Sequence, residues 1–254
     1  MRRRGRSGQV LVVTSLVVVT LLLSTVVYVL ETEKNAPVCQ PASDLSLGAV
    51  KLAALHTLTS ALVNVSGGGD PAVLAGDLAL FKSDLEHYSY SSSSQLNCQL
   101  TYSSEGVWVS WGTEGEGVSS ASVDFAFNFS GSPESYFFLY PLNLTSKVTI
   151  EGTYVRLHEG LKDANITINV SSDGAPAEAK VLDVYYYHYA NSSGLGQGWD
   201  ILAPPQTISY GNGTYALSFT ADTKNRNDPL LVSAHFVDPR GVSVWANATC
   251  TLLP

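Results

Sequence analysis

Residues 211–222 read GNGTYALSFTAD, and residues 230–248 read LLVSAHFVDPRGVSVWANA. Their apolar runs are bounded by residues that favour tight turns, Gly211-Asn212-Gly213 and Asp238-Pro239-Arg240-Gly241. The same pattern extends back to about residue 146, where Ser172-Asp173-Gly174 is an earlier turn. We therefore expect an all-β region with strands near 147–157, 164–171, 179–190, 206–210, 213–220, 230–237 and 242–251.

Seven short strands in about 108 residues are typical of an immunoglobulin-like sandwich. The two quoted stretches resemble the last three strands of immunoglobulin-like modules in prokaryotic surface proteins. This resemblance covers about 40% of the chain. It implies a β-sandwich domain over residues 146–254, and it implies no activity.

The preceding part, residues 31–145, has two different periodicities. A helix is expected from Ser43-Asp44 to about Val63, and a second one from Asp70-Pro71, with Gly67 to Gly69 between them. From Gln95 the apolar period changes to two, which predicts strands at 99–102, 107–111, 123–130 and 136–140. The fold class is therefore α+β. Because the gap near Thr145–Val148 contains no Pro or Gly linker, the two β regions either form separate domains or share a core.

Residues 10–30 read VLVVTSLVVVTLLLSTVVYVL and carry no charge. About 20 apolar residues span the hydrocarbon core of a bilayer, so this segment predicts a transmembrane helix. Four arginines precede it within the basic leader 1–9, and they predict that the N-terminus stays in the cytoplasm. We expect a single-pass protein of the cell membrane, with everything after residue 30 outside the cell.

The leader leaves three alternatives for processing. Residues 31–41 contain no convincing small-x-small site, which disfavours a cleaved secretory signal. An uncleaved signal anchor is the simplest alternative. The third is based on the stretch Arg6-Ser7-Gly8-Gln9-Val10, which resembles the N-termini of archaeal type IV pilins. That resemblance implies cleavage after Gly5 or Gly8, a helix-first, β-head order of parts, and assembly into filaments.

One feature departs from the pilin pattern. Many bacterial pilins carry a glutamate at the fifth mature position, where this chain has Val10 or Val13. The departure weakens the resemblance to bacterial pilins more than the resemblance to archaeal ones.

Charge excludes some classes of partner. Four of the 14 basic residues lie in the leader, so the remainder carries 10 basic and 22 acidic residues, a net charge of −12. Such a surface repels nucleic acid and anionic lipid headgroups. We expect a soluble, cell-surface part that binds no nucleic acid.

Glycosylation sequons are frequent. Eight of the 12 asparagines begin an Asn-x-Ser/Thr sequence, which marks candidate N-glycosylation sites on an exported chain. They are Asn64, Asn128, Asn143, Asn165, Asn169, Asn191, Asn212 and Asn247. Their number predicts a surface glycoprotein.

The three cysteines are Cys39, Cys98 and Cys250. A disulfide is permitted outside the cell, and Cys39–Cys98 and Cys98–Cys250 are both open pairings. No C-x-x-C motif occurs, so the sequence offers no zinc or redox site.

No recognisable catalytic or cofactor motif occurs in the sequence. The five histidines are scattered, and neither a G-x-S-x-G elbow nor a P-loop is present. Gly194 to Gly198 predict a flexible loop. The oxygen-bearing side chains of Asp222, Asn225, Asn227 and Asp228 lack EF-hand spacing, so a solvated loop is favoured over a calcium site. We expect no enzyme, no metal and no cofactor.

An aromatic strand is the remaining candidate site. Tyr185 to Tyr187, His188 and Tyr189 should alternate between core and solvent. The outward residues would form a patch for sugar or protein contact, or a sheet face that a neighbouring subunit covers. Trp108 and Trp111 raise the same possibility. Two functions are expected: a type IV pilin-like structural or adhesion subunit, or a non-filamentous surface protein whose immunoglobulin-like domain binds a glycan or protein.

Overall fold

The computed structural model describes residues 47–91, 97–130, 135–158, 160–189, 198–202, 208–223 and 227–254. Residues 46–254 form one compact unit. The expected membrane span 10–30 and the processing candidates Gly5 and Gly8 lie outside the described residues, as do Cys39 and Asn191.

Two helices precede the strands, as the sequence predicts. Helix α2 (Leu47–Ser66) buries an apolar stripe that includes Ala54, Leu58 and Leu62. The chain then turns at Gly68, whose φ of +92° favours glycine. Helix α3 (Val73–Ser91) follows Asp70, whose Oδ1 accepts a hydrogen bond from the amide of Ala72 at 2.8 Å.

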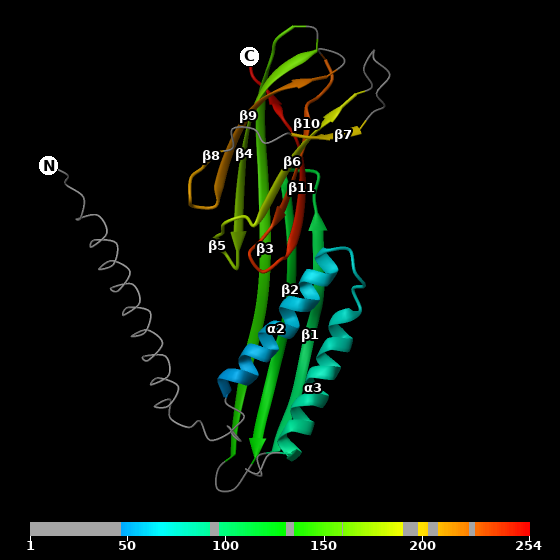
Figure 1. The fold of residues 1–254 in the computed structure, drawn as a ribbon, viewed down its shortest axis with the longest axis vertical. Coiled ribbons are helices and arrows are strands. Elements are labelled where there is room, and N and C mark those ends of the chain that lie inside the picture. The colour runs from blue at the N-terminus through cyan, green and yellow to red at the C-terminus, as the bar shows by residue number, and fades with distance from the viewer. Residues whose placement is uncertain are drawn as a thin grey trace, which may run out of the picture. The chain divides into compact units, whose positions relative to one another are not determined.

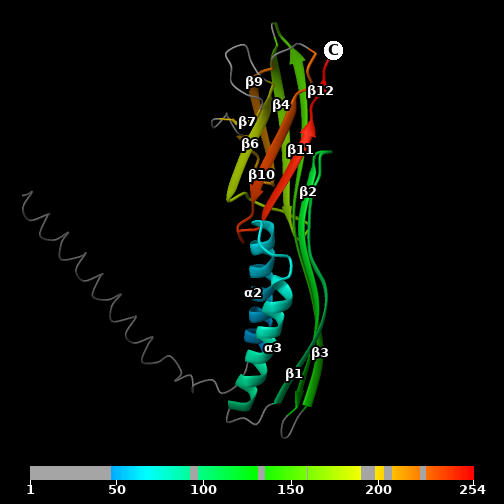
Figure 2. The same cartoon turned by 90° about the vertical axis from the view of Figure 1, so that its right-hand side faces the viewer.

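Three long antiparallel strands form the sheet against which both helices pack. They are β1 (Asn97–Trp111), β2 (Glu116–Ser130) and β3 (Ser135–Arg156). Figure 1 and Figure 2 show α2 and α3 side by side on one face of these strands. Val123, Phe125, Phe127 and Phe129 point to this face and are buried, and Phe125 meets the ring of Phe81 at 6.0 Å between centroids. The predicted alternation over 123–130 is confirmed.

Further strands extend this sheet and build a second one. Strands β4 (Leu161–Ser172), β9 (Thr214–Asp222) and β8 (Ile208–Ser209) complete the order β1-β2-β3-β4-β9-β8, which we call sheet A. Sheet B has the order β11 (Ser243–Thr249), β10 (Leu231–Val237), β6 (Val181–His188) and β7 (Gly198–Ile201). The short β5 (Ala175–Pro176) pairs with β4, and β12 (Thr251–Leu252) pairs in parallel with β3.

One apolar core joins the two sheets. Sheet A contributes residues such as Ile150, Ile166 and Ile168, and sheet B contributes residues such as Val232 and Phe236. The described fold is therefore α+β, with two helices and antiparallel sheets, and its C-terminal part is consistent with a β-sandwich. Of the expected strand at 206–210, the structure describes residues 208–210, and Ile208–Ser209 form β8; β7 was not predicted.

Strand β3 runs without interruption through residues 145–146, the expected domain boundary. The β1–β2 turn adds a second connection, because the amide of Gly115 donates to the carbonyl of Asn247 at 2.7 Å and the amide of Asn247 donates to Gly112 at 3.0 Å. A Cβ atom at Gly117 would overlap the carbonyl group of Trp245, so glycine is required for this close crossing. The helical region and the sandwich thus share a strand and a backbone contact.

A buried ion pair fixes the turn between β10 and β11. Asp238 is fully buried and accepts hydrogen bonds from Ser146 Oγ at 2.7 Å, from the amide of Val242 at 2.9 Å and from Arg240 Nε at 2.8 Å. Burial alone would raise the pKa of Asp238, but these hydrogen bonds and the Arg240 charge lower it below its usual value. Arg240 also contacts the exposed Asp173 at 2.7 Å.

Candidate binding and glycosylation surfaces

The predicted aromatic strand is β6, and its side chains alternate as expected. Val184 and Tyr186 point into the core, where Tyr186 packs 5.9 Å from the ring of Phe219. Tyr185 and Tyr187 point to the outer face of sheet B because successive residues of a strand face opposite sides. The sequence prediction is confirmed for this alternation, and the structure adds neighbours that the sequence could not indicate.

Residues from three other strands complete an aromatic surface on the outer face of sheet B. We define this aromatic face as Tyr185, Tyr187, Trp199, His235 and Trp245. Trp245 stacks on His235 at 4.2 Å and lies 5.7 Å from Tyr185, while Trp199 meets Tyr187 at 5.4 Å. Trp199 remains 45% exposed, and the other four are half-buried. Such a face offers large ring surfaces at little cost in side-chain entropy.

The tyrosine hydroxyls near this face remain protonated at neutral pH. Burial, and then the negative charge of Asp183, raises the pKa of Tyr185 above its usual value. Burial also raises the pKa of Tyr189, whose ring lies 5.1 Å from that of Tyr187. Both hydroxyls are therefore available as hydrogen-bond donors to a bound group.

A Ser–His–Asp series of contacts includes His235 of the aromatic face and has a long His–Asp distance. His235 Nε2 lies 2.8 Å from Ser243 Oγ, whereas its Nδ1 lies 3.5 Å from Asp183 Oδ2, beyond normal hydrogen-bond length. The amide of Ser243 donates to Ser66 Oγ at 3.0 Å, so it is not available to stabilise an oxyanion. This arrangement stabilises the sheet and holds His235 against Trp245.

Four of the seven described sequon asparagines lie on the opposite side from the aromatic face, on the outer face of sheet A. Of the seven that the structure describes, six are exposed and Asn247 is half-buried. Asn128, Asn143, Asn165 and Asn169 point to the outer face of sheet A, and Asn212 lies in the turn before β9. None of the seven lies in the core, as a glycosylation site requires.

Local hydrogen bonds involve the amide oxygens of these asparagines. Ser218 Oγ donates to Asn165 Oδ1 at 2.6 Å, and Thr214 Oγ1 donates to Asn169 Oδ1 at 2.8 Å. Thr145, the third residue of its sequon, donates to Asn143 Oδ1 at 3.3 Å. The amide nitrogen, to which an N-linked sugar attaches, takes no part in these bonds.

Two buried thiols exclude one of the open disulfide pairings. Cys98 and Cys250 are both free and buried. Cys98 pairs across strands with Phe129, which faces Tyr136, whereas Cys250 packs against Gly152. Tyr136 and Gly152 lie 16 residues apart on β3, so the cysteines are about 50 Å apart, far beyond disulfide reach. Cys39–Cys98 stays a prediction.

The acidic segment expected as a solvated loop holds a buried lysine. Lys162 is fully buried, its amine donates to the main-chain carbonyl of Asp228, and it lies 5.1 Å from the ring centre of Tyr154. Burial lowers the pKa of Lys162, and the charge of Asp228 opposes this shift.

Within the described ranges, no group of three or more His, Cys, Asp or Glu side chains is arranged to hold a metal.

The other aromatic candidates from the sequence, Trp108 and Trp111, lie outside the aromatic face, and Trp108 is on the outer face of sheet A. Trp108 and Trp111 are 57% and 42% exposed, and they point to opposite sides of β1.

Among the described residues, α2 is the one helix long and apolar enough to cross a bilayer. It packs against the sheet, and a core helix of a soluble domain has the same composition, so this is weak evidence for a span.

Comparisons with known proteins add no family. No protein-family model matches the chain, and no curated protein matches its sequence.

Proposed function

We propose that this chain is a membrane-anchored, glycosylated extracellular structural or adhesion protein, a type IV pilin-like subunit. The observation that carries this proposal is the order of its parts: an uncharged segment of 21 residues, Val10–Leu30, followed by one compact unit over residues 46–254. The apolar segment anchors the chain in the bilayer. On assembly, apolar helices of neighbouring copies replace the lipid chains around it.

The strand order supports an immunoglobulin-like head. In the immunoglobulin fold, strands A, B, E and D form one sheet, and strands G, F and C form the other, with C′ added beside C in some members. If β3 is strand A, the orders β3-β4-β9-β8 and β11-β10-β6-β7 follow this arrangement in chain order. In this proposal the head has β3 as its first strand, and β1 and β2 extend the same sheet below it.

The proposed role is not catalytic. The Ser243–His235–Asp183 contacts lack a short His–Asp hydrogen bond and a free serine amide. The outer faces of both sheets instead present rings and sequon asparagines, which suit adhesion and modification. A structural or adhesive role therefore fits the exposed side chains best.

The mature N-terminus tests this proposal directly. Mass spectrometry of membrane material should find a chain that begins at Arg6 or Gln9, as prepilin-type cleavage after Gly5 or Gly8 would give. Electron microscopy of cells expressing a tagged chain should then show filaments that carry the tag. A start at Met1 would support an uncleaved anchor without filaments, and a start beyond Leu30 would refute both anchoring and assembly.

A second candidate function, glycan or protein recognition by a non-filamentous anchored protein, is favoured by the aromatic face. Trp199 is 45% exposed beside Tyr187, an arrangement that suits stacking on a sugar ring. Replacing Trp199 by Ala should weaken binding of cells to a neutral oligosaccharide surface. Trp108→Ala removes a tryptophan of β1 that is 57% exposed, and it serves as the control.

A further inference from the structure

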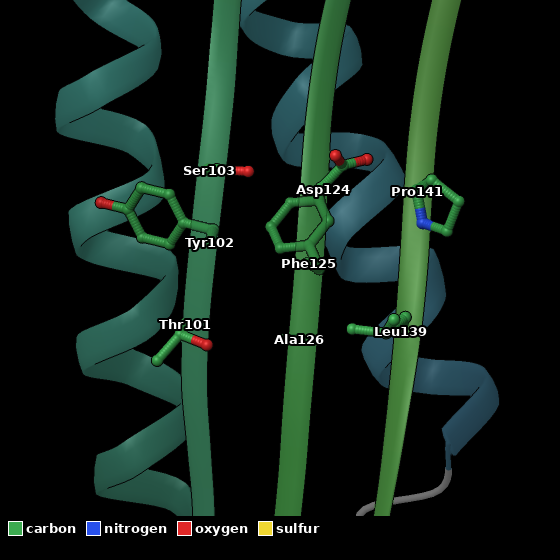
Figure 3. Close-up of a pocket in the computed structure, with 8 residues that line it drawn as sticks. All are labelled: Thr101, Tyr102, Ser103, Asp124, Phe125, Ala126, Leu139 and Pro141. Carbon is green, nitrogen blue, oxygen red and sulfur yellow. The ribbon is translucent and has the colours of Figure 1, made fainter.

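An apolar stripe is exposed on the outer face of sheet A, on the side away from the helices. Phe137 and Leu139 on β3 are 63% and 68% exposed, and Pro141 continues the stripe. Beside it lies a groove of about 580 Å³, lined in part by Thr101, Asp124 and Leu139. Figure 3 shows Thr101, Asp124 and Leu139 on three neighbouring strands, with Pro141 on the same strand as Leu139. A row of exposed aromatic and aliphatic side chains indicates a surface that another group covers.

A sequon asparagine lies within this stripe. In the β2–β3 register, Asn128 is directly opposite Phe137, and Ala126 is opposite Leu139. Directly opposite residues on one face have Cβ atoms about 5 Å apart, so a sugar on Asn128 starts beside the Phe137 ring. The sequon is completed by Ser130, and both Asn128 and Ser130 are exposed.

We propose that an N-linked glycan on Asn128 lies over Phe137 and Leu139 and fills the adjoining groove. This inference rests on the proposed extracellular location. In the reaction, the amide nitrogen of Asn128 forms a bond to C1 of the sugar and loses one proton. The bond between C1 and the phosphate of a lipid-linked oligosaccharide donor breaks, and the lipid phosphate leaves.

Other occupants fit the stripe less well. A stable contact with a second copy buries about 800 Å² per partner, far more area than the three side chains of Phe137, Leu139 and Pro141 expose. Pairing of a new strand along β3 is opposed by Pro141, which lacks an amide donor. An anionic lipid surface is repelled by the net charge of −12 outside the membrane.

Two measurements on the full chain in its membrane test whether a glycan on Asn128 covers Phe137. They are glycopeptide mass spectrometry and hydroxyl-radical footprinting. Asn128 should be occupied, and Asn128→Gln should raise oxidation of Phe137 at least about twofold, because a sugar on one ring face halves its exposed area. Asn165→Gln is the matched control. It removes a sequon on the same face of sheet A that is flanked by Thr153 and Ser218, and it should leave Phe137 oxidation unchanged.

Ser130→Ala removes the same sequon while keeping Asn128, so it repeats the test if Asn128→Gln fails to fold. Occupied sequons elsewhere with an unmodified Asn128 would overturn this inference alone. An occupied Asn128 whose loss leaves Phe137 oxidation unchanged would show that the glycan points to solvent, which also overturns it. No occupied sequon at all would instead refute the glycoprotein part of the proposed function.

Discussion

Replacing the buried Asp238 by Asn tests the ion pair that fixes the β10–β11 turn. Asn keeps an oxygen to accept the Val242 amide. It also places an amide nitrogen where the carboxylate accepts hydrogen bonds from Ser146 and Arg240. The new amide nitrogen then faces the Arg240 Nε–H donor at a buried position, and the charge that paired with Arg240 is lost, so the variant should be clearly less stable than the wild type.

The size of the loss follows from burial. Removing one partner of a buried ion pair costs about 3–5 kcal/mol. Arg240 is 24% exposed and keeps its contact with Asp173, so we expect a loss near the lower end, about 3 kcal/mol. For a unit of this size, the melting temperature should fall by roughly 6–12 °C.

Thermal unfolding of the full chain in detergent micelles, followed by near-ultraviolet circular dichroism, measures this loss. Because the pKa of folded Asp238 is lowered, its ionisation stabilises the fold above the usual aspartate value of about 3.9 and loses this effect at lower pH. The difference between the proteins should therefore be full at pH 7 and shrink below about pH 4. Asp173→Asn, at an exposed partner of the same arginine, should cost less than about 1 kcal/mol. Equal losses in the two variants, or a difference independent of pH, would refute the reasoning.

Three further predictions concern packing, thiols and anchoring. In urea unfolding, Gly117→Ala should lower the free energy of unfolding by about 2 kcal/mol, because its Cβ would overlap a carbonyl of β11. Gly76→Ala, in open space on α3, should raise the free energy of unfolding by about 0.5 kcal/mol. Burial raises the pKa of Cys250 to about 12, so its alkylation at pH 8, followed by peptide mass spectrometry, should be at least about tenfold slower in the native chain than in urea. Rapid labelling of native Cys250 would contradict this. Leu21→Arg should remove the chain from carbonate-washed membranes, since an arginine at the centre of a membrane helix raises the free energy of insertion by about 3 kcal/mol. Retention at the wild-type level would refute the anchor.

The sequence predicted the helices and most strands because their signals are local. The period of two over 123–130 needs no knowledge of the partner strand. By contrast, β7 has only four residues, too few for a period to register, and it forms because β6 offers an open edge. The aromatic face was predicted only for its β6 members. His235 and Trp245 join them because β10 lies between β6 and β11, a strand order that no local pattern encodes.

Pro141 lies inside β3, in the gap between the two strands expected at 136–140 and 147–157. Proline lacks a backbone donor and is normally excluded from central strands. In the structure, residues 135–145 of β3 pair with β2 on one side, and β4 begins to pair only at Ser146. Pro141 therefore lies where β3 is an edge strand, and the pairing of the sheet tolerates it.

The two outer faces of the sandwich impose different conditions on assembly. Sheet A carries Asn128, Asn143, Asn165 and Asn169, and a glycan on any of them would keep a neighbouring copy away from that face. Sheet B carries the aromatic face and, among the described sequons, only the half-buried Asn247. Helix α2 also carries an exposed sequon asparagine, Asn64. If the chain forms filaments, close contacts between copies therefore belong to sheet B. In that case the same tryptophan and tyrosine rings serve both the structural and the adhesive function, and the two proposals differ only in what binds them.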